Sequence, residues 1–142
     1  MSDDKQRSIL WHGMALFLLG LLTGFVEPHF SNPRMGLAAH LEGLMNGTFL
    51  IALGAIWQHL KLSGQSLSAT YWLARYGAYA NWATTTLAAV FGANSLSLIT
   101  GAGHSAQPWQ EMLVTLGFAS VGLSMLATSA LALWGLRRTV IA

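Results

Sequence analysis

The chain contains no cysteine and little charge, and both absences narrow what it can be. Without cysteine it has no disulfide, no thiolate metal ligand and no cysteine nucleophile. Charged residues make up 8% of the 142 residues, against about 25% in an average soluble domain. So little charge does not cover a water-facing surface, and the composition therefore argues against a soluble enzyme and for a membrane protein.

Four apolar segments are long enough to span a lipid bilayer. A spanning helix needs about 20 mainly apolar residues, because each residue rises about 1.5 Å and the hydrocarbon core is about 30 Å thick. The predicted spans cover residues 9–27, 34–60, 71–98 and 110–136. Unbroken apolar runs disfavour a barrel, whose strands alternate in polarity. We therefore expect an all-α integral membrane protein, with residues 1–142 forming one up-down-up-down four-helix bundle.

Lysine and arginine near the ends of these segments predict how the chain is oriented. Only Arg34 lies in the first connection, whereas five basic residues lie near the termini and in the second connection: Lys5, Arg7, Lys61, Arg137 and Arg138. Because basic residues favour the cytoplasmic side, we expect an inner (cytoplasmic) membrane protein with both termini in the cytoplasm. The net charge is +2 and no block of basic residues occurs, so no nucleic-acid partner is expected.

Glycines recur at helical spacing in the first two apolar segments. The first segment has Gly13, Gly20 and Gly24, and the second has Gly36, Gly43, Gly47 and Gly54. Small residues at this spacing let two membrane helices approach closely. In the second segment a histidine, His40, shares the face of Gly43 and Gly47, so a flat cofactor lying on this smooth surface is an alternative interpretation.

His40 is the deepest histidine of the predicted spans. It lies seven residues beyond Pro33, which places it roughly 10 Å inside the helix. Ionisable residues at such depth are functional candidates. Its ring either forms an interhelical hydrogen bond or binds a metal, and one histidine is sufficient for haem iron. Arg34, six residues earlier, is close enough for a haem propionate, although an interfacial cation is the simpler interpretation.

Three further polar residues lie within the second and third segments. Glu42 and Asn46 are four residues apart and share a helix face, and Glu42 is rotated by about 200° from His40. This face meets either a neighbouring helix or a neighbouring subunit. Asn81 belongs to a comparable polar stripe on the third segment, where hydrogen bonding between helices is the simpler interpretation.

The string from Ala39 to Gly47, AHLEGLMNG, resembles the Ala-His-x5-Asn-Gly signature of styrene oxide isomerases and hydroxylaminobenzene mutases. The sequence is more similar to the mutases. Three other strings carry this likeness: Trp11-His12-Gly13, the run from Leu18 to Gly24, and Asn32-Pro33-Arg34-Met35-Gly36. The resemblance covers most of the first two segments and is thinner over the last two.

The resemblance implies a homotrimer that holds a b-type haem between its subunits. It implies His40 as the axial ligand of the iron and Asn46 as a residue facing the substrate. Tyr79-Ala80-Asn81 is similar to a Trp-Ala-Asn string of the isomerases, which makes Asn81 a second candidate. The isomerases carry a tyrosine four residues after this asparagine, whereas this chain has Thr85, and that difference disfavours styrene oxide as the substrate.

The implied activity is an isomerisation of N-aryl hydroxylamines, such as phenylhydroxylamine, to 2-aminophenols. Ferric haem b would act as the Lewis acid, Asn46 and Asn81 would orient the substrate, and the cofactor would contact Gly43, Gly47 and Arg34. The alternatives are an epoxide-to-aldehyde isomerase, a non-catalytic haem membrane subunit that carries electrons, and a small transporter with Glu42 as its coupling carboxylate.

Overall fold

The computed structural model describes residues 2–137, which form four long helices joined by connections. The helices are α1 (Ser2–Val26), α2 (Pro33–Ala55), α3 (Gly64–Phe91) and α4 (Pro108–Leu136). Single 3-10 turns, Glu27–His29 and Trp57–His59, follow α1 and α2. No strand occurs among the described residues, so the predicted all-α class is confirmed.

The starts of three helices follow from ordinary capping chemistry. The Asn32 side chain accepts a hydrogen bond from the backbone N–H of Met35 at 3.1 Å, ahead of the first-turn proline of α2. Ser63 caps α3 by accepting from the backbone N–H of Ser66 at 3.2 Å. A capping box formed by Gln107 and Gln110 opens α4.

Several helix boundaries differ from the predicted segments, most clearly in α2 and α3. The second segment was expected to continue to residue 60, but α2 ends at Ala55 and a 3-10 turn follows. The third was expected at 71–98, whereas α3 covers Gly64–Phe91. It starts early because Ser63 caps a polar first turn, and it ends early because Gly92 adopts φ +70, a left-handed conformation that stops a helix.

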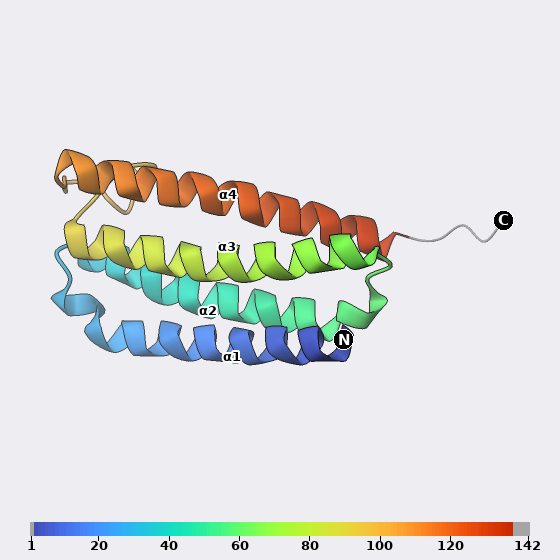
Figure 1. The fold of residues 1–142 in the computed structure, drawn as a ribbon. Coiled ribbons are helices and arrows are strands. Elements are labelled where there is room, and N and C mark those ends of the chain that lie inside the picture. The colour runs from blue at the N-terminus through green and yellow to red at the C-terminus, as the bar shows by residue number, and fades with distance from the viewer. Residues whose placement is uncertain (1, 138–142) are drawn as a thin grey trace.

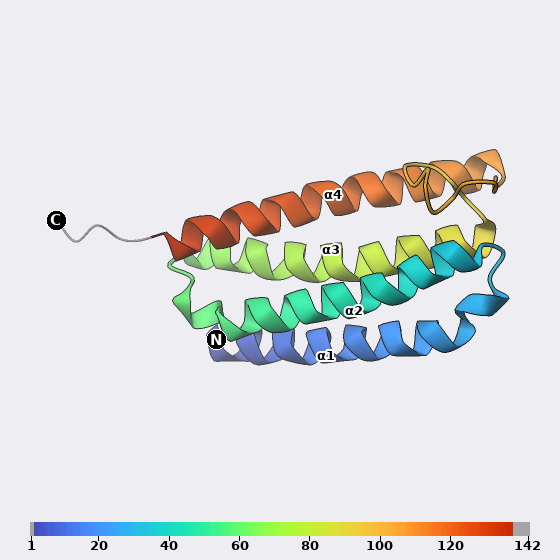
Figure 2. The ribbon, with the colours of Figure 1, turned by 180° about the vertical axis from the view of Figure 1, so that it is seen from behind.

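The helices run antiparallel in succession and lie side by side in chain order, as the two opposite views show (Figures 1 and 2). Extensive contacts join α1 to α2, α2 to α3 and α3 to α4, while α1 touches α3 only slightly. The start of α1 and the end of α4 therefore lie at the same end of the molecule. Because α4 packs mainly on α3 and not on α1, the four helices form an open row.

The seam between α1 and α2 is a backbone contact made by glycines. A Cβ atom added at Gly43 would collide with the Cα of Gly20. One added at Gly47 would lie 2.6 Å from the backbone nitrogen of Phe17. The glycine stripes therefore allow close helix packing, as predicted for the first segment.

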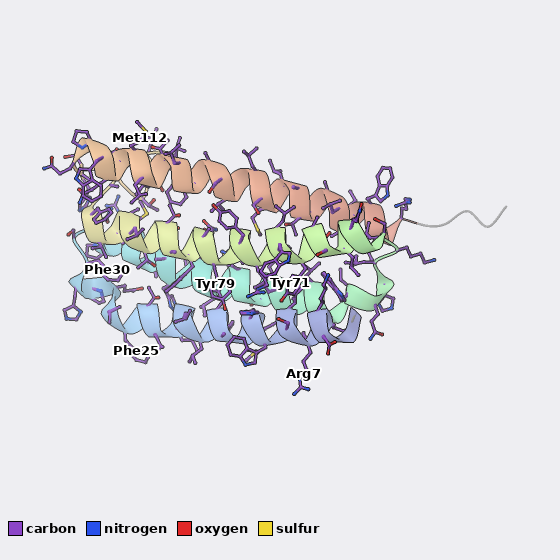
Figure 3. All side chains as sticks on the ribbon, in the orientation of Figure 1. Arg7, Phe25, Phe30, Tyr71, Tyr79 and Met112 are labelled. Atoms are coloured by element: carbon purple, nitrogen blue, oxygen red, sulfur yellow. The ribbon has the colours of Figure 1, made fainter. Side chains whose placement is uncertain are left out.

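Large apolar side chains cover the outer faces of α1 and α4. Figure 3 shows Arg7 and Phe25 of α1 pointing away from the other helices, and Phe25 is 79% exposed. On α4, Leu123 is 73% and Leu133 is 74% exposed. Two stretches of the described chain, Asp4–His29 and Pro108–Leu136, are long and apolar enough to cross a membrane. Four such stretches were predicted.

Two apolar clusters occupy the two ends of the helix row. One surrounds Trp57 and includes Leu50 of α2 and Ala78 of α3. The other contains Met35 of α2 and Ala88 of α3. Along both α2 and α3, the polar residues of the middle turns lie between these clusters, and the candidate site is found there.

Candidate functional site

A carboxylate holds two amide side chains at the seam between α2 and α3. The Oε2 atom of Glu42 accepts hydrogen bonds from Nδ2 of Asn46 at 2.9 Å and from Nδ2 of Asn81 at 2.6 Å. Nδ2 of Asn46 also donates to the backbone carbonyl of Glu42 at 2.8 Å. Asn46 is buried, and Glu42 and Asn81 are half-buried. These three residues, the amide cluster, link the two helices in their middle turns.

The face that carries Glu42 meets a neighbouring helix. Of the two interpretations left open by the sequence, the structure supports the first, since Asn81 of α3 is the partner. Sequence reasoning singled out both asparagines but did not include Glu42 in the site. The i, i+4 spacing of Glu42 and Asn46 was the available signal, but a helix projection does not identify the residue across the seam.

His40 lies on the other seam of α2, against α1. Its Nδ1 atom is 2.7 Å from the carbonyl oxygen of Gly20. A carbonyl only accepts, so Nδ1 carries a hydrogen, and in the neutral ring the lone pair is then on Nε2. Within residues 2–137, Nε2 forms no hydrogen bond. A Cβ atom at Gly24 would lie 2.7 Å from Nδ1, so this glycine leaves space for the ring.

This geometry suits a histidine that binds a metal through Nε2. Metal-ligating histidines commonly donate the other ring N–H to a carbonyl, which fixes the tautomer and the orientation of the ring. Among the described residues, no group of three or more His, Cys, Asp or Glu side chains comes together. A metal at His40 would therefore take most of its ligands from a cofactor, and a haem fits this requirement.

The other predicted cofactor contacts lie elsewhere. Gly43 and Gly47 face the backbone of α1, so no flat cofactor can lie against them within this chain. Helix packing, the first of the two interpretations, accounts for both glycines. Arg34 is exposed and donates to the carbonyl oxygen of Ile99 at 3.2 Å, so it contacts the third connection.

The hydroxyl of Thr85, at the position where the isomerases have tyrosine, is used within its own helix. It donates to the carbonyl oxygen of Asn81 at 2.8 Å, and the residue is buried. The threonine therefore offers no free donor in place of a tyrosine. A tyrosine six residues earlier, Tyr79, has its hydroxyl 3.1 Å from Nδ1 of His12 on α1.

The connection between α3 and α4 is fastened at several points. The carboxylate of Glu111 accepts from the backbone N–H groups of Asn94 and Ser95 at 3.2 and 3.0 Å. Nδ2 of Asn32 donates to the carbonyl oxygen of Thr100 at 2.8 Å, which ties the middle of the connection to the start of α2. These contacts hold the segment against α2 and α4.

Comparison with models of known protein families shows which family the chain belongs to. The family model described as styrene oxide isomerase matches residues 5–137. The chain belongs to this family. Hydroxylaminobenzene mutase HabB of Ectopseudomonas oleovorans is 50% identical over 132 residues, which are 92% of this chain and 80% of the relative.

Hydroxylaminobenzene mutase HabA of the same organism is 43% identical over 127 residues, which are 89% of this chain and 94% of the relative. No solved structure matches the chain. The predicted resemblance to the mutases is confirmed, and so is the prediction that this member of the family is an enzyme, an isomerase.

Proposed function

We propose that this isomerase converts N-aryl hydroxylamines, such as phenylhydroxylamine, to 2-aminophenols. The observation that carries the proposal is the 50% identity, over 92% of the chain, to a protein named hydroxylaminobenzene mutase. The amide cluster supports it, because it supplies polar groups between the two apolar clusters of the helix row. A small aromatic ring fits such surroundings, and its polar substituent needs hydrogen-bond partners.

We further propose that His40 holds a haem b through Nε2. The hydrogen bond from Nδ1 to Gly20 supports this assignment, since in the neutral ring it places the lone pair on Nε2. When bound, ferric haem supplies a Lewis acid that weakens the N–O bond of the substrate. His40 and the amide cluster lie on different seams of α2, so a homotrimer that joins the His40 side of one copy to the cluster of another is part of the proposal.

The chain's own residues orient the substrate and exclude water. The rearrangement breaks the N–O bond, forms a C–O bond at the ortho carbon and moves one proton from that carbon to nitrogen. Substrate and product have the same atoms and the same number of electrons, so neither NAD(P)H nor oxygen is consumed. Asn46 and Asn81 hold the hydroxylamine group, and the surrounding apolar side chains keep water away from the electron-poor ring.

The membrane location is proposed from the outer surface. Exposed leucines on α4 and exposed aromatic and aliphatic side chains on α1 would contact lipid. The basic residues near both chain ends favour a cytoplasmic position for the termini. Because the chain lacks cysteine, single cysteines at positions 2 and 31 can be labelled selectively in intact cells. Labelling of position 31 alone is expected, and labelling of position 2 alone would contradict the orientation.

The reaction is tested by running it in oxygen-18 water with purified protein. We expect 2-aminophenol that carries the oxygen of the substrate, because a hydroxyl returned within a dry site does not exchange with solvent. Heavy oxygen in most of the product would mean that water attacks a released cation. Absence of 2-aminophenol would refute the proposed activity itself.

The haem is tested by the absorption spectrum of purified protein. The wild type should show a Soret band, and His40→Ala should lose it while it still accumulates. His59→Ala is the matched control, because His59 is exposed in the turn after α2. A His40→Ala protein with a full Soret band of unchanged shape would remove His40 from the ligand role.

A further inference from the structure

The amide cluster has a fixed hydrogen-bond polarity. Both hydrogens of the Asn46 amide are occupied, one by the backbone carbonyl and one by the carboxylate of Glu42. One hydrogen of the Asn81 amide points at the same carboxylate oxygen. A backbone carbonyl only accepts hydrogen bonds, so the bond to the carbonyl oxygen of Glu42 fixes the orientation of the Asn46 amide. In the structure the NH2 group of each asparagine faces Glu42, and each side-chain carbonyl oxygen is directed elsewhere.

Three acceptor oxygens of the cluster remain open. They are Oδ1 of Asn46, Oδ1 of Asn81 and Oε1 of Glu42, and none of them forms a hydrogen bond within residues 2–137. None is sealed from its surroundings either, since the fully enclosed polar side-chain atoms without a partner in that range belong to Glu27 and Trp57. The cluster thus presents mainly acceptors, with one N–H of Asn81 left as a donor.

The two substrate chemistries of this family differ in what they offer such a surface. An N-aryl hydroxylamine carries an N–H and an O–H, so it donates two hydrogen bonds. An epoxide carries no polar hydrogen and only accepts. A site that is rich in acceptors binds the first and leaves its own oxygens unpaired against the second.

We propose that Glu42 is a positioning residue that sets the substrate class. By holding the NH2 groups of Asn46 and Asn81, it turns their carbonyl oxygens toward the substrate and favours hydrogen-bond donors over acceptor-only epoxides. This inference rests on the proposed function, which places the two asparagines at the substrate. It goes further by assigning the discrimination to a residue that acts through both of them.

The test compares two ligands of similar size on Glu42→Gln and Glu42→Ala. The readout is the ratio of the inhibition constant of styrene oxide to the KM of phenylhydroxylamine. An alanine accepts no hydrogen bond from the asparagines, and the NH2 group of a glutamine can donate to an asparagine carbonyl oxygen and so reverse that amide. In either variant an amide hydrogen becomes available to an epoxide oxygen. We expect the ratio to fall about tenfold in both variants, the effect of about one hydrogen bond.

The control is Glu27→Gln, the same chemical change at a carboxylate whose Oε2 is buried and has no hydrogen-bond partner among the described residues. It should leave the ratio within about twofold, well below the change expected for one hydrogen bond. If Glu42 served only as a link between helices, its loss would weaken both ligands equally. Unchanged ratios in both Glu42 variants would therefore overturn the inference.

Failure of the proposed function has a different signature. A wild-type protein that forms no 2-aminophenol would refute the reaction, and equilibrium dialysis of phenylhydroxylamine and styrene oxide would then give the two affinities directly. A wild-type preference for phenylhydroxylamine that the Glu42 variants lose supports the polarity assignment in that case too. Equal wild-type affinities for the two ligands would overturn it.

Discussion

The seams on either side of the α2–α3 pair are built in opposite ways. Between α1 and α2 the backbones touch, with Gly43 lying directly on Gly20. Between α3 and α4, side chains fill the space. A Cβ atom added at Gly77 would lie 2.6 Å from the sulfur atom of Met125. A methionine tip moves easily, whereas a helix backbone does not. The first seam is therefore intolerant of added atoms and the second adapts to them.

The intolerant seam is the one that holds His40. The carbonyl of Gly20 both belongs to the glycine contact and accepts from Nδ1 of His40. Any separation of α1 from α2 lengthens this hydrogen bond and releases the ring. The close backbone contact thus fixes the orientation of the candidate ligand, in addition to holding the two helices together.

The largest effect is expected from Gly43→Ala. Its Cβ would meet the backbone of Gly20, so the two helices must separate along the seam. Overpacking of this kind costs typically up to about 3 kcal/mol, and we expect a loss near that value in the free energy of unfolding. Thermal unfolding in detergent measures it, and the Soret band should weaken in parallel. Wild-type stability would show that the seam is not rigid.

A smaller effect is expected from Gly77→Ala on the other seam. The Met125 side chain can rotate away from the new methyl group, so the loss should be about 1 kcal/mol, the low end of the overpacking range. Gly122→Ala is the control, since a Cβ at Gly122 meets nothing within 4 Å. The same unfolding assay ranks the three. A Gly77→Ala protein as unstable as Gly43→Ala would remove the contrast between the seams.

The smallest effect is expected from Ser124→Ala. Its hydroxyl donates to the carbonyl oxygen of Leu73 at 2.8 Å and so joins α4 to α3. Hydrogen bonds between membrane helices average about 0.6 kcal/mol, and the loss should be close to this value. Activity should stay at the wild-type level, because Ser124 lies between α3 and α4, whereas the amide cluster lies between α2 and α3. A loss of activity would mean that α4 reaches the site.

The number, direction and approximate place of the helices could be predicted because they depend on the length of apolar runs. The ends of α3 could not. Residues 64–70 are mostly polar but helical because Ser63 caps them, and Leu96 and Leu98 lie outside the helix because Gly92 ends it in a left-handed conformation. Hydropathy measures burial in an apolar phase, whereas helix ends depend on caps and on backbone conformation.

The sequence predicted which residues belong to the candidate site, but it did not predict which residues they contact. The signature singled out His40 and Asn46, and a polar stripe singled out Asn81. A helix projection separates the faces of His40 and Glu42, but it does not state that Gly20 and Asn81 lie across from them. The same limitation left two interpretations for Gly43, and only the position of α1 decides between them.

Glu111 has a consequence for how the α3–α4 connection moves. Its carboxylate binds backbone N–H groups at both ends of the segment, those of Asn94 and Ser95 at the start and that of Ala106 at the end. A single side chain thus joins the two ends of the connection. When the Glu111 carboxylate moves away, the hydrogen bonds at both ends break together, so the amide protons of the three residues should exchange with deuterium in one cooperative event.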